Sequence, residues 1–263
     1  RFHAQPNACP NCGPKMWLED RQGRFVDCAQ YTDEIEMAAA LIRRGLIVAV
    51  KGIGGIQLAC DASNEDAVRE LRTRKFRRDK ALALMAQGID MVSQFATVNA
   101  AEKALLLSTA SPIVVVQKSG LALAQNIAFE QNTLGFMLPY SPLHVLLMKN
   151  MTSPIVLTSG NRSEEPQVIN NEDARQQLNQ IADYFLLHDR PIVSRLDDSV
   201  VIISADKPRV LRRARGYTPK QLQLPEGFGN STGILAMGAD LKNTFCILKN
   251  GKAIVSQHIG DLE

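Results

Sequence analysis

The sequence predicts an α/β domain built on a mixed sheet, because short apolar strands alternate with amphipathic helix patterns over roughly residues 33–220. The clearest strands are the apolar runs at residues 46–50 and 154–157, each of which is followed by a glycine-containing turn. The composition agrees, since 45% of the 263 residues are hydrophobic and 22% are charged. A chain of this kind is long enough to bury one large core with small appendages.

The N-terminal part of the chain predicts a loop-rich segment followed by two helices. Residues 1–31 are rich in Pro, Gly, Asn and Cys without a regular period, which is typical of a metal-binding segment. A helix is predicted from Asp33, with Glu36 completing a capping pair and Gly45 at the position of a C-terminal cap. A second helix is predicted to start near residue 63 or 64 and to end in a basic cluster.

The remaining elements continue the alternation of strands and helices. The patterns predict strands at residues 81–85, 112–117, 184–187, 199–203 and 209–213, and helices at residues 88–95, 99–108, 143–149 and 172–181. Pro and Gly then predict a linker at residues 223–232. A new β pattern begins at Ile234 and ends in two strands at 246–248 and 253–256.

The bulk composition excludes several classes of protein. A net charge of +3 is too small to predict nucleic-acid binding by itself, and no apolar run is long enough to span a bilayer. Five cysteines, an odd number, do not predict a disulfide framework, so a reducing cytoplasm is the expected location. We also expect an excised piece of a longer protein, because the chain begins at Arg1 rather than at Met.

Two segments far apart in the sequence together predict a phosphate site. Lys75 and Arg77 place two cations one residue apart at the end of a helix, and Thr158-Ser159-Gly160-Asn161 is a small polar turn directly after a buried strand. Cations with hydroxyl, amide and backbone N–H donors are what the phosphates of a nucleotide require. Taken singly, the cations fit a solvated helix end slightly better than a ligand site, and the turn fits an ordinary loop equally well. Their pairing favours an enzyme of activated phosphate chemistry.

Other polar residues have competing interpretations. Lys51 directly follows the first buried strand and precedes a Gly-rich turn, residues 52–55, that allows a backbone to approach a ligand. Asp197 and Asp198 fit either a Mg²⁺ site or, slightly better, ion pairs with arginines. His144 lies in an apolar helix and is more typical of a satisfied, partly buried histidine than of a base.

The N-terminal cysteines predict half of a zinc site. Cys9 and Cys12 have the Cys-x-x-Cys spacing of a zinc knuckle, but tetrahedral zinc requires two further ligands. Cys28 lacks a partner at that spacing. We therefore expect the other half of the site to lie outside this sequence.

Taken together, these segments resemble the YrdC-type domain and, within that group, the HypF family of hydrogenase-maturation carbamoyltransferases. The resemblance rests on Lys75-Phe76-Arg77 before an apolar strand, the Gly/Pro signature at 134–143, the Ser-x-Asn turn at 158–166, and Arg215-Gly216. The turn 51–55 with 58–62, the run 211–217 and the motif 238–244 are similar to the HypF branch. The resemblance implies an open twisted mixed sheet with helices in residues 32–222, a zinc-finger remnant in 1–31 and the first strands of an ASKHA-type transferase domain in 233–263.

The resemblance also implies an activity. In this family an acylphosphatase domain hydrolyses carbamoyl phosphate, and the YrdC-like domain adenylates the resulting carbamate with ATP. The ASKHA-type domain then passes the carbamoyl group to the C-terminal cysteine of HypE, where it becomes the cyanide ligand of NiFe hydrogenase. The adenylation step is the one expected to fall within this chain, with ATP, Mg²⁺ and structural Zn²⁺ as its cofactors.

Residue roles are implied by the same resemblance. Lys75 and Arg77 are the expected catalytic cations, and Cys9 and Cys12 the expected zinc ligands. The remaining expected phosphate, carbamate or Mg²⁺ contacts are Lys51, Thr158, Ser159, Asn161, Arg195 and Arg215.

Two other functions compete with this one. The tRNA-modifying branch of the family makes threonylcarbamoyl-AMP, which would make threonine a substrate. A basic concave face could instead bind RNA, but Phe76 is the one aromatic residue within the basic cluster, which weakens a stacking platform.

Overall fold

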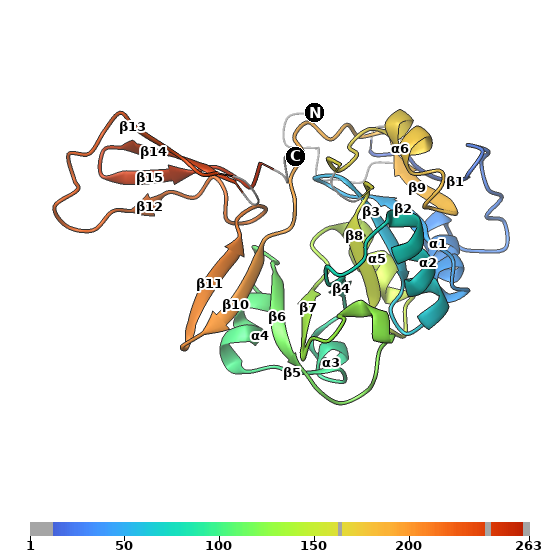
Figure 1. Ribbon diagram of the computed structural model, residues 1–263. Coiled ribbons are helices and arrows are strands. Elements are labelled where there is room, and N and C mark those ends of the chain that lie inside the picture. Colours follow the sequence, from blue (N-terminus) through green and yellow to red (C-terminus); the bar gives the residue numbers. More distant parts are fainter. Residues whose placement is uncertain (1–12, 163–164, 240–242, 260–263) are drawn as a thin grey trace.

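The computed structural model describes residues 13–162, 165–239 and 243–259. Its elements are arranged as a large α/β body and a separate small sheet (Figure 1). In chain order they are β1 Met16–Asp20, α1 Glu34–Arg43, β2 Val48–Lys51, β3 Ile56–Asp61, α2 Glu65–Lys75, β4 Ala83–Met85, α3 Ile89–Val92, β5 Ala96–Thr97, α4 Ala100–Leu106, β6 Ile113–Lys118, the 3₁₀ turn η1 Gln125–Ile127, β7 Thr133–Met137, α5 Pro142–Lys149, β8 Ile155–Ser159, α6 Asn171–Gln177, β9 Tyr184–His188, β10 Val200–Ser204, β11 Lys207–Arg212, β12 Leu222–Gln223, β13 Ile234–Met237, β14 Phe245–Lys249 and β15 Lys252–Val255.

Local chemistry explains where the first two helices begin and end. The Asp33 side chain accepts a hydrogen bond from the backbone N–H of Glu36 at 2.8 Å, which caps α1. Gly45, with φ +86°, follows the end of this helix as predicted. Asn64 caps α2 in the same way, and Phe76 ends it in a left-handed conformation with φ 56°. The predicted helix starts are therefore confirmed.

The main sheet is mixed, as predicted. Its path is β1-β9-β2-β3-β8-β4-β7-β6-β10-β11, with β5 added beside β6. The pairs β2–β9, β4–β7 and β6–β10 are parallel, and the other pairs along this path are antiparallel. This topology brings the C-terminal ends of α2 and β8 together at one region of the sheet, although they are far apart in the sequence.

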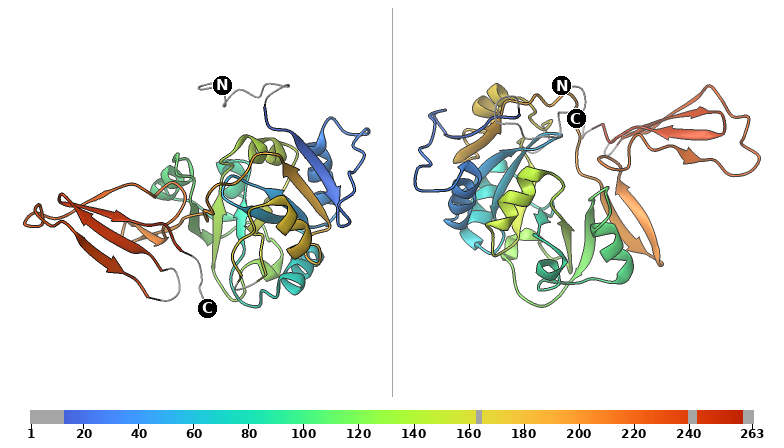
Figure 2. Two further views of the ribbon diagram at one scale, coloured as in Figure 1. Left: turned by 90° about the horizontal axis from the view of Figure 1, so that it is seen from above. Right: turned by 180° about the vertical axis from the view of Figure 1, so that it is seen from behind.

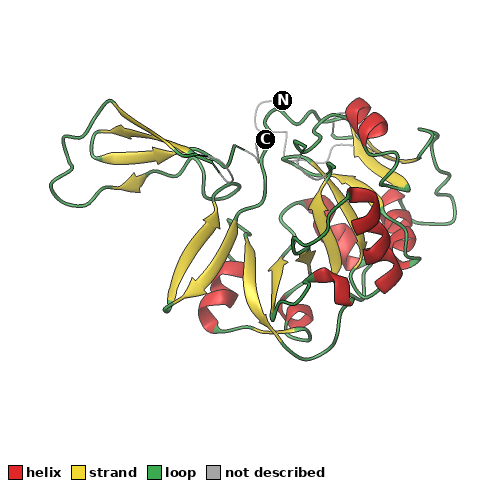
Figure 3. Ribbon diagram, viewed as in Figure 1, coloured by secondary structure: helices red, strands yellow, loops and turns green. Residues whose placement is uncertain are grey.

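Helices cover both faces of this sheet (Figure 3). On one face α1 and α5 pack over alternate strand residues such as Val48 and Val50. On the other face α2, α6 and η1 pack over residues that include Ala49 and Leu58. Strands buried on both faces are almost continuously apolar, which is why β2 was recognisable in the sequence.

Several strands depart from the sequence prediction, among them β1, β3 and β7. β1 lies within residues 1–31, which were predicted to be loop-rich, yet it pairs with β9. Its signal is hidden by Glu19, a 2% exposed acid held by Arg175 through bonds of 2.7 and 2.8 Å. β3 and β7 were also missed, because Gln57 and Gly135 interrupt their apolar runs.

The second sheet has four strands in the order β12-β15-β14-β13. It projects to one side of the main body in all three views (Figures 1 and 2). The predicted strands from Ile234 onward are confirmed, but the start of the predicted linker is wrong at Gln223, which pairs with Lys252. Within the described residues no helix has the length and apolarity to cross a bilayer.

Candidate functional site

The two segments that predict a phosphate site meet in the structure. Lys75 at the end of α2 reaches the turn that follows β8, and its Nζ donates to the carbonyl oxygens of Ser159 and Asn161, both at 2.6 Å. It also donates to the Oδ1 of Asn161, at 2.7 Å. A lysine from one element therefore fixes the shape of a turn 84 residues further along the chain. The side chain of Asn161 also donates to the carbonyl of Glu165, which closes the turn.

Lys75 is buried, with 1% of its surface exposed, so its charge is only weakly screened by solvent. Burial, and after it the neighbouring Arg77, lowers the pKa of its ammonium group to about 7, and the charge of Glu165 opposes this shift. Three acceptor oxygens around one nitrogen favour the protonated form. The hydrogen bonds of this side chain to the three oxygens therefore act on the turn itself.

Arg77 shapes the loop opposite this turn. Its Nε and Nη2 donate to the carbonyls of Lys80 and Ala81, at 3.1 and 2.6 Å. Arg77 lines two adjoining cavities, so it faces the space between the Ser159–Asn161 turn and its own loop, residues 77–80. Of the two predicted catalytic cations, Arg77 is the more accessible.

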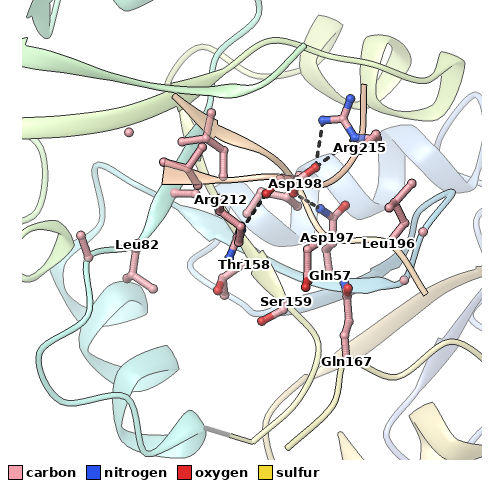
Figure 4. Close-up of a pocket in the computed structure, with 18 of the residues that line it drawn as sticks. Gln57, Leu82, Thr158, Ser159, Gln167, Leu196, Asp197, Asp198, Arg212 and Arg215 are labelled. Carbon is pink, nitrogen blue, oxygen red and sulfur yellow. Dashed lines mark hydrogen bonds and ion pairs between the residues drawn. The ribbon is translucent and has the colours of Figure 1, made fainter. Parts of the chain in front are cut away.

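The inner cavity has a volume of about 230 Å³ and lies over the ends of β3, β7 and β8 (Figure 4). Thr158 and Ser159 line it on one side, and Asp198 and Arg215 on the other. Gln57 bridges the two sides, since its Nε2 donates to Asp198 at 3.1 Å. The cavity is therefore small and has a polar network at one end, in which the Tyr140 hydroxyl donates to the Oε1 of Gln57 at 3.0 Å.

Arg215 is already extensively bonded. Its guanidinium donates to Asp198 at 2.9 and 3.2 Å and to the carbonyls of Ala110 and Ser111 at 3.0 and 2.8 Å, and it lies 3.5 Å from the centre of the Tyr140 ring. This confirms the ion-pair interpretation of Asp198. Arg215 therefore lines the inner cavity, and the bonds of its guanidinium hold the wall of that cavity together.

The outer cavity is larger, about 1150 Å³, and contains most of the predicted phosphate contacts. Ser159 and Asn161 form one part of its wall. Its lining includes the cations Lys75, Arg77, Lys80, Arg195 and Arg212. The opposite wall is formed by residues of β14 and β15 and by 256–259, so the second sheet closes this space. The same lining contains the acidic residues Glu165 and Asp197, so basic residues predominate, which suits a polyanionic ligand.

Lys51 is not brought to either cavity. It is 3% exposed, and its Nζ donates to the carbonyl of His188 at 3.0 Å. The glycines after it serve packing within the protein: Leu196 N donates to Gly54 O at 2.9 Å, and a Cβ at Gly54 would overlap Leu196 O. The close approach predicted for this turn is therefore real, but the partner is another protein segment.

Two further expectations concern histidine and metal. His144 is fully buried rather than partly buried, its Nδ1 lies 2.9 Å from the Ser141 hydroxyl, and burial lowers the pKa of this histidine to about 3. Within the described residues its Nε2 has no hydrogen-bond partner, so the histidine is only half satisfied. Cys9 and Cys12 lie outside the described residues. Within the described ranges no group of three or more His, Cys, Asp and Glu is arranged to hold a metal.

Several cavity residues were not singled out from the sequence. Tyr140, Gln57, Gln167 and Arg212 line the inner cavity, and His258 lines the outer one. Only Gln57 carried a usable signal, because a polar residue inside an otherwise apolar strand must be satisfied by a partner. The other residues become neighbours through sheet topology alone.

Comparison with known proteins gives three family-model matches. The Sua5/YciO/YrdC model, described as "Telomere recombination", matches residues 40–214. The "HypF Kae1-like domain" model matches residues 229–263, and the "HypF finger" model matches residues 1–19.

Relatives and solved structures agree with these matches. The chain is 48% identical over 263 residues, its full length, to carbamoyltransferase HypF of Rhodobacter capsulatus, of which it covers 34%. A crystal structure of full-length HypF "in the phosphate- and nucleotide-bound form" superposes with a TM-score of 0.90 at 45% identity, with 100% of this chain and 34% of that chain covered. Pyrococcus abyssi Sua5 complexed with L-threonine, at 20% identity and a TM-score of 0.62 over 69% of this chain and 54% of its own, shows the fold alone. The chain spans about a third of the length of the curated relatives it matches.

Proposed function

Because the chain belongs to the Sua5/YciO/YrdC family and is similar to HypF carbamoyltransferases over its whole length, we propose that it carries the site that converts ATP and carbamate into carbamoyl adenylate. The supporting observation is the contact of Lys75 with the Ser159–Asn161 turn at the edge of a cationic cavity. The same arrangement would suit any triphosphate. The choice of carbamate rests on the similarity to carbamoyltransferases.

The proposed step joins two anions. A carbamate oxygen attacks the α-phosphorus of ATP, the bond from that phosphorus to the bridging oxygen breaks, and pyrophosphate leaves with the electron pair. No covalent nucleophile of the protein takes part, so the protein must hold the reactants in line and neutralise charge. Arg77 and Arg212 line both cavities, and in this proposal they would neutralise the charge of the reactants where the cavities adjoin.

The remaining residues would bind and orient. Ser159 and Asn161 would contact phosphate oxygens, and Lys80 and Arg195 would balance the charge of the departing pyrophosphate in the outer cavity. Thr158 and the Gln57–Asp198 network would close the small inner cavity around the carbamate. We leave Lys51 out of this set, since its position by His188 is away from both cavities.

Metals enter this proposal in two limited ways. Asp197 and Asp198 are engaged by His258 and Arg215 and offer no preformed carboxylate cage. Mg²⁺ would therefore arrive with ATP and neutralise charge at the phosphates. Cys9 and Cys12 would contribute half of a structural zinc site, in keeping with the "HypF finger" match over residues 1–19. No step of the reaction is assigned to either ion.

The wider role follows from the relatives. We propose that carbamoyl phosphate is the source of the carbamate and that the carbamoyl group is finally passed to the C-terminal cysteine of HypE, in the maturation of NiFe hydrogenase in the cytoplasm. Those steps would need parts of the protein beyond residues 32–222.

The test is isotope exchange between pyrophosphate and ATP in the full-length protein, with carbamate supplied as carbamoyl phosphate or directly as ammonium carbamate. We expect Arg77→Ala to lower carbamate-dependent exchange by about 100- to 1000-fold, as for the loss of one oxyanion donor. Arg78→Ala is the matched control, because Arg78 is exposed and lines neither cavity. Exchange that requires threonine would support the tRNA-modifying branch, and strongly salt-dependent RNA binding without exchange would support the RNA module.

The depressed pKa of Lys75 predicts a proton linkage. In the free protein the pKa of about 7 leaves Lys75 mostly neutral at pH 8, and phosphates bound at the turn would favour its protonated form. Binding of ATP at pH 8 should therefore take up protons, and the affinity for ATP should fall as the pH rises above 7, by at most about tenfold per pH unit for a single group. Calorimetry in two buffers of different ionisation enthalpy measures the uptake. Zero uptake at pH 8, or the same uptake in Lys75→Met, would contradict this assignment.

A further inference from the structure

Residues 256–259 follow β15 of the small sheet. They lie along the loop of residues 195–198, in which Leu196 and Asp197 line both cavities. Gln257 donates from its Nε2 to the carbonyl of Arg195 at 2.8 Å, and the backbone N–H of His258 donates to the carbonyl of Arg213 at 2.7 Å. Between these two contacts the His258 Nδ1 lies 3.3 Å from Asp197 Oδ2. The segment is thus docked by side-chain and main-chain contacts together.

The contact between His258 and Asp197 is well shielded. The side chain of His258 is 5% exposed and that of Asp197 is 22% exposed. Burial raises the pKa of Asp197, but the hydrogen bond from His258 and the charges of Arg212 and Arg195 outweigh it, so that the pKa lies below its usual value. Asp197 is therefore held as a carboxylate at neutral pH, and a donor from the second sheet is one of the groups that hold it.

Asp197 belongs to the wall that shapes the proposed reaction site. Its backbone carbonyl accepts from the N–H of Arg215 at 3.1 Å, and its neighbour Asp198 carries the bonds to Gln57 and Arg215. On its other side Leu196 is bonded to Gly54. A shift of Asp197 would move the inner cavity and the outer cavity together, because both are lined by this residue.

We propose that His258 is a positioning residue for the adenylation site: by holding Asp197 it makes the geometry of that site depend on docking of the small sheet against the α/β body. The proposal rests on the function proposed above. Its consequence is that a labile acyl adenylate forms efficiently when the second structural unit is in place beside the cavity, and slowly when it is not.

Three variants of the full-length protein test the role of His258 in carbamate-dependent exchange. His258→Ala should lower kcat for exchange by up to about 100-fold, the effect of misplacing a reacting group by about 1 Å, with a smaller change in KM for ATP. His258→Asn keeps a donor near the Nδ1 position and should restore most of the rate. Lys252→Ala is the matched control, since Lys252 is an exposed residue of the same strand segment and lines neither cavity.

A double-mutant cycle supplies the second readout. If His258 acts through Asp197, the combined His258→Ala and Asp197→Ala variant should lose no more activity than the worse single variant. Additive losses, or equal activity of His258→Ala, His258→Asn and the unchanged protein, would overturn the inference. In that case Arg77→Ala would still abolish exchange if the proposed function holds, so the two failures are distinguishable.

Discussion

Replacing Lys75 with methionine should reduce carbamate-dependent exchange by at least about 100- to 1000-fold, and it should also loosen the turn that follows β8. The methyl group of methionine has nearly the reach of the ammonium but cannot donate. The carbonyls of Ser159 and Asn161, together with Asn161 Oδ1, would then lose their shared donor. A buried acceptor left unpaired costs about 1–3 kcal/mol, so the free energy of unfolding should fall by at least that amount.

The two effects on Lys75→Met are separated by measuring them in one preparation. Urea unfolding gives the change in stability, and exchange well below the unfolding midpoint gives the change in rate. Arg69→Met is the control, because Arg69 lies on the same helix and is held by an exposed ion pair with Asp66 that is worth little. A Lys75→Met protein that exchanges within tenfold of the unchanged protein would remove Lys75 from the site.

The second large effect is expected from Gly54→Ala. A Cβ on Gly54 would overlap the carbonyl oxygen of Leu196 and would lie 3.0 Å from the Leu196 Cβ. Because the clash is with backbone, the loop that carries Asp197 and Asp198 must move away from the Gly-rich turn. Overpacking of this kind costs about 1–3 kcal/mol of stability, and we expect exchange to fall with it, since this loop forms the wall of both cavities.

Gly229→Ala is the matched control for Gly54→Ala. An added Cβ at Gly229 meets no atom within 4 Å, and its φ is not in the left-handed region. Its free energy of unfolding should stay within about 0.5 kcal/mol of the unchanged protein. A Gly54→Ala protein with unchanged stability and unchanged exchange would show that the loop is not fixed by this contact.

Much of the fold could be read from local sequence. Capping residues such as Asp33 and Asn64 bond to backbone N–H groups a few residues further along the chain. A strand buried on both faces, such as β2, is visible in the sequence as an apolar run. Prediction failed where a polar residue is buried by a distant partner. Glu19 in β1 and Gln57 in β3 look like loop residues until Arg175 and Asp198 are known to lie beside them.

The same division applies to the site. Residue types and motif order were enough to pair Lys75-x-Arg77 with the Ser159-x-Asn161 turn, and the family matches confirm the resemblance. The individual roles of these residues remain predictions. Sequence alone could not show that Lys75 donates hydrogen bonds to the turn, that Arg215 pairs with Asp198, or that Lys51 lies beside His188 and away from both cavities.

By itself, then, the sequence determined the α/β class and the starts of the first two helices, and it singled out the two segments predicted to form a phosphate site, because each of these signals depends on neighbours along the chain. The tertiary structure alone decided which cations line the outer cavity and which ones donate hydrogen bonds to backbone carbonyls. It alone brought His258 to Asp197. The physical reason is that hydrogen-bond partners and burial are set by contacts between distant elements, such as those of Lys75 with Ser159, 84 residues away, and of Gln57 with Asp198, 141 residues away. These contacts decide which side chains can still reach a ligand.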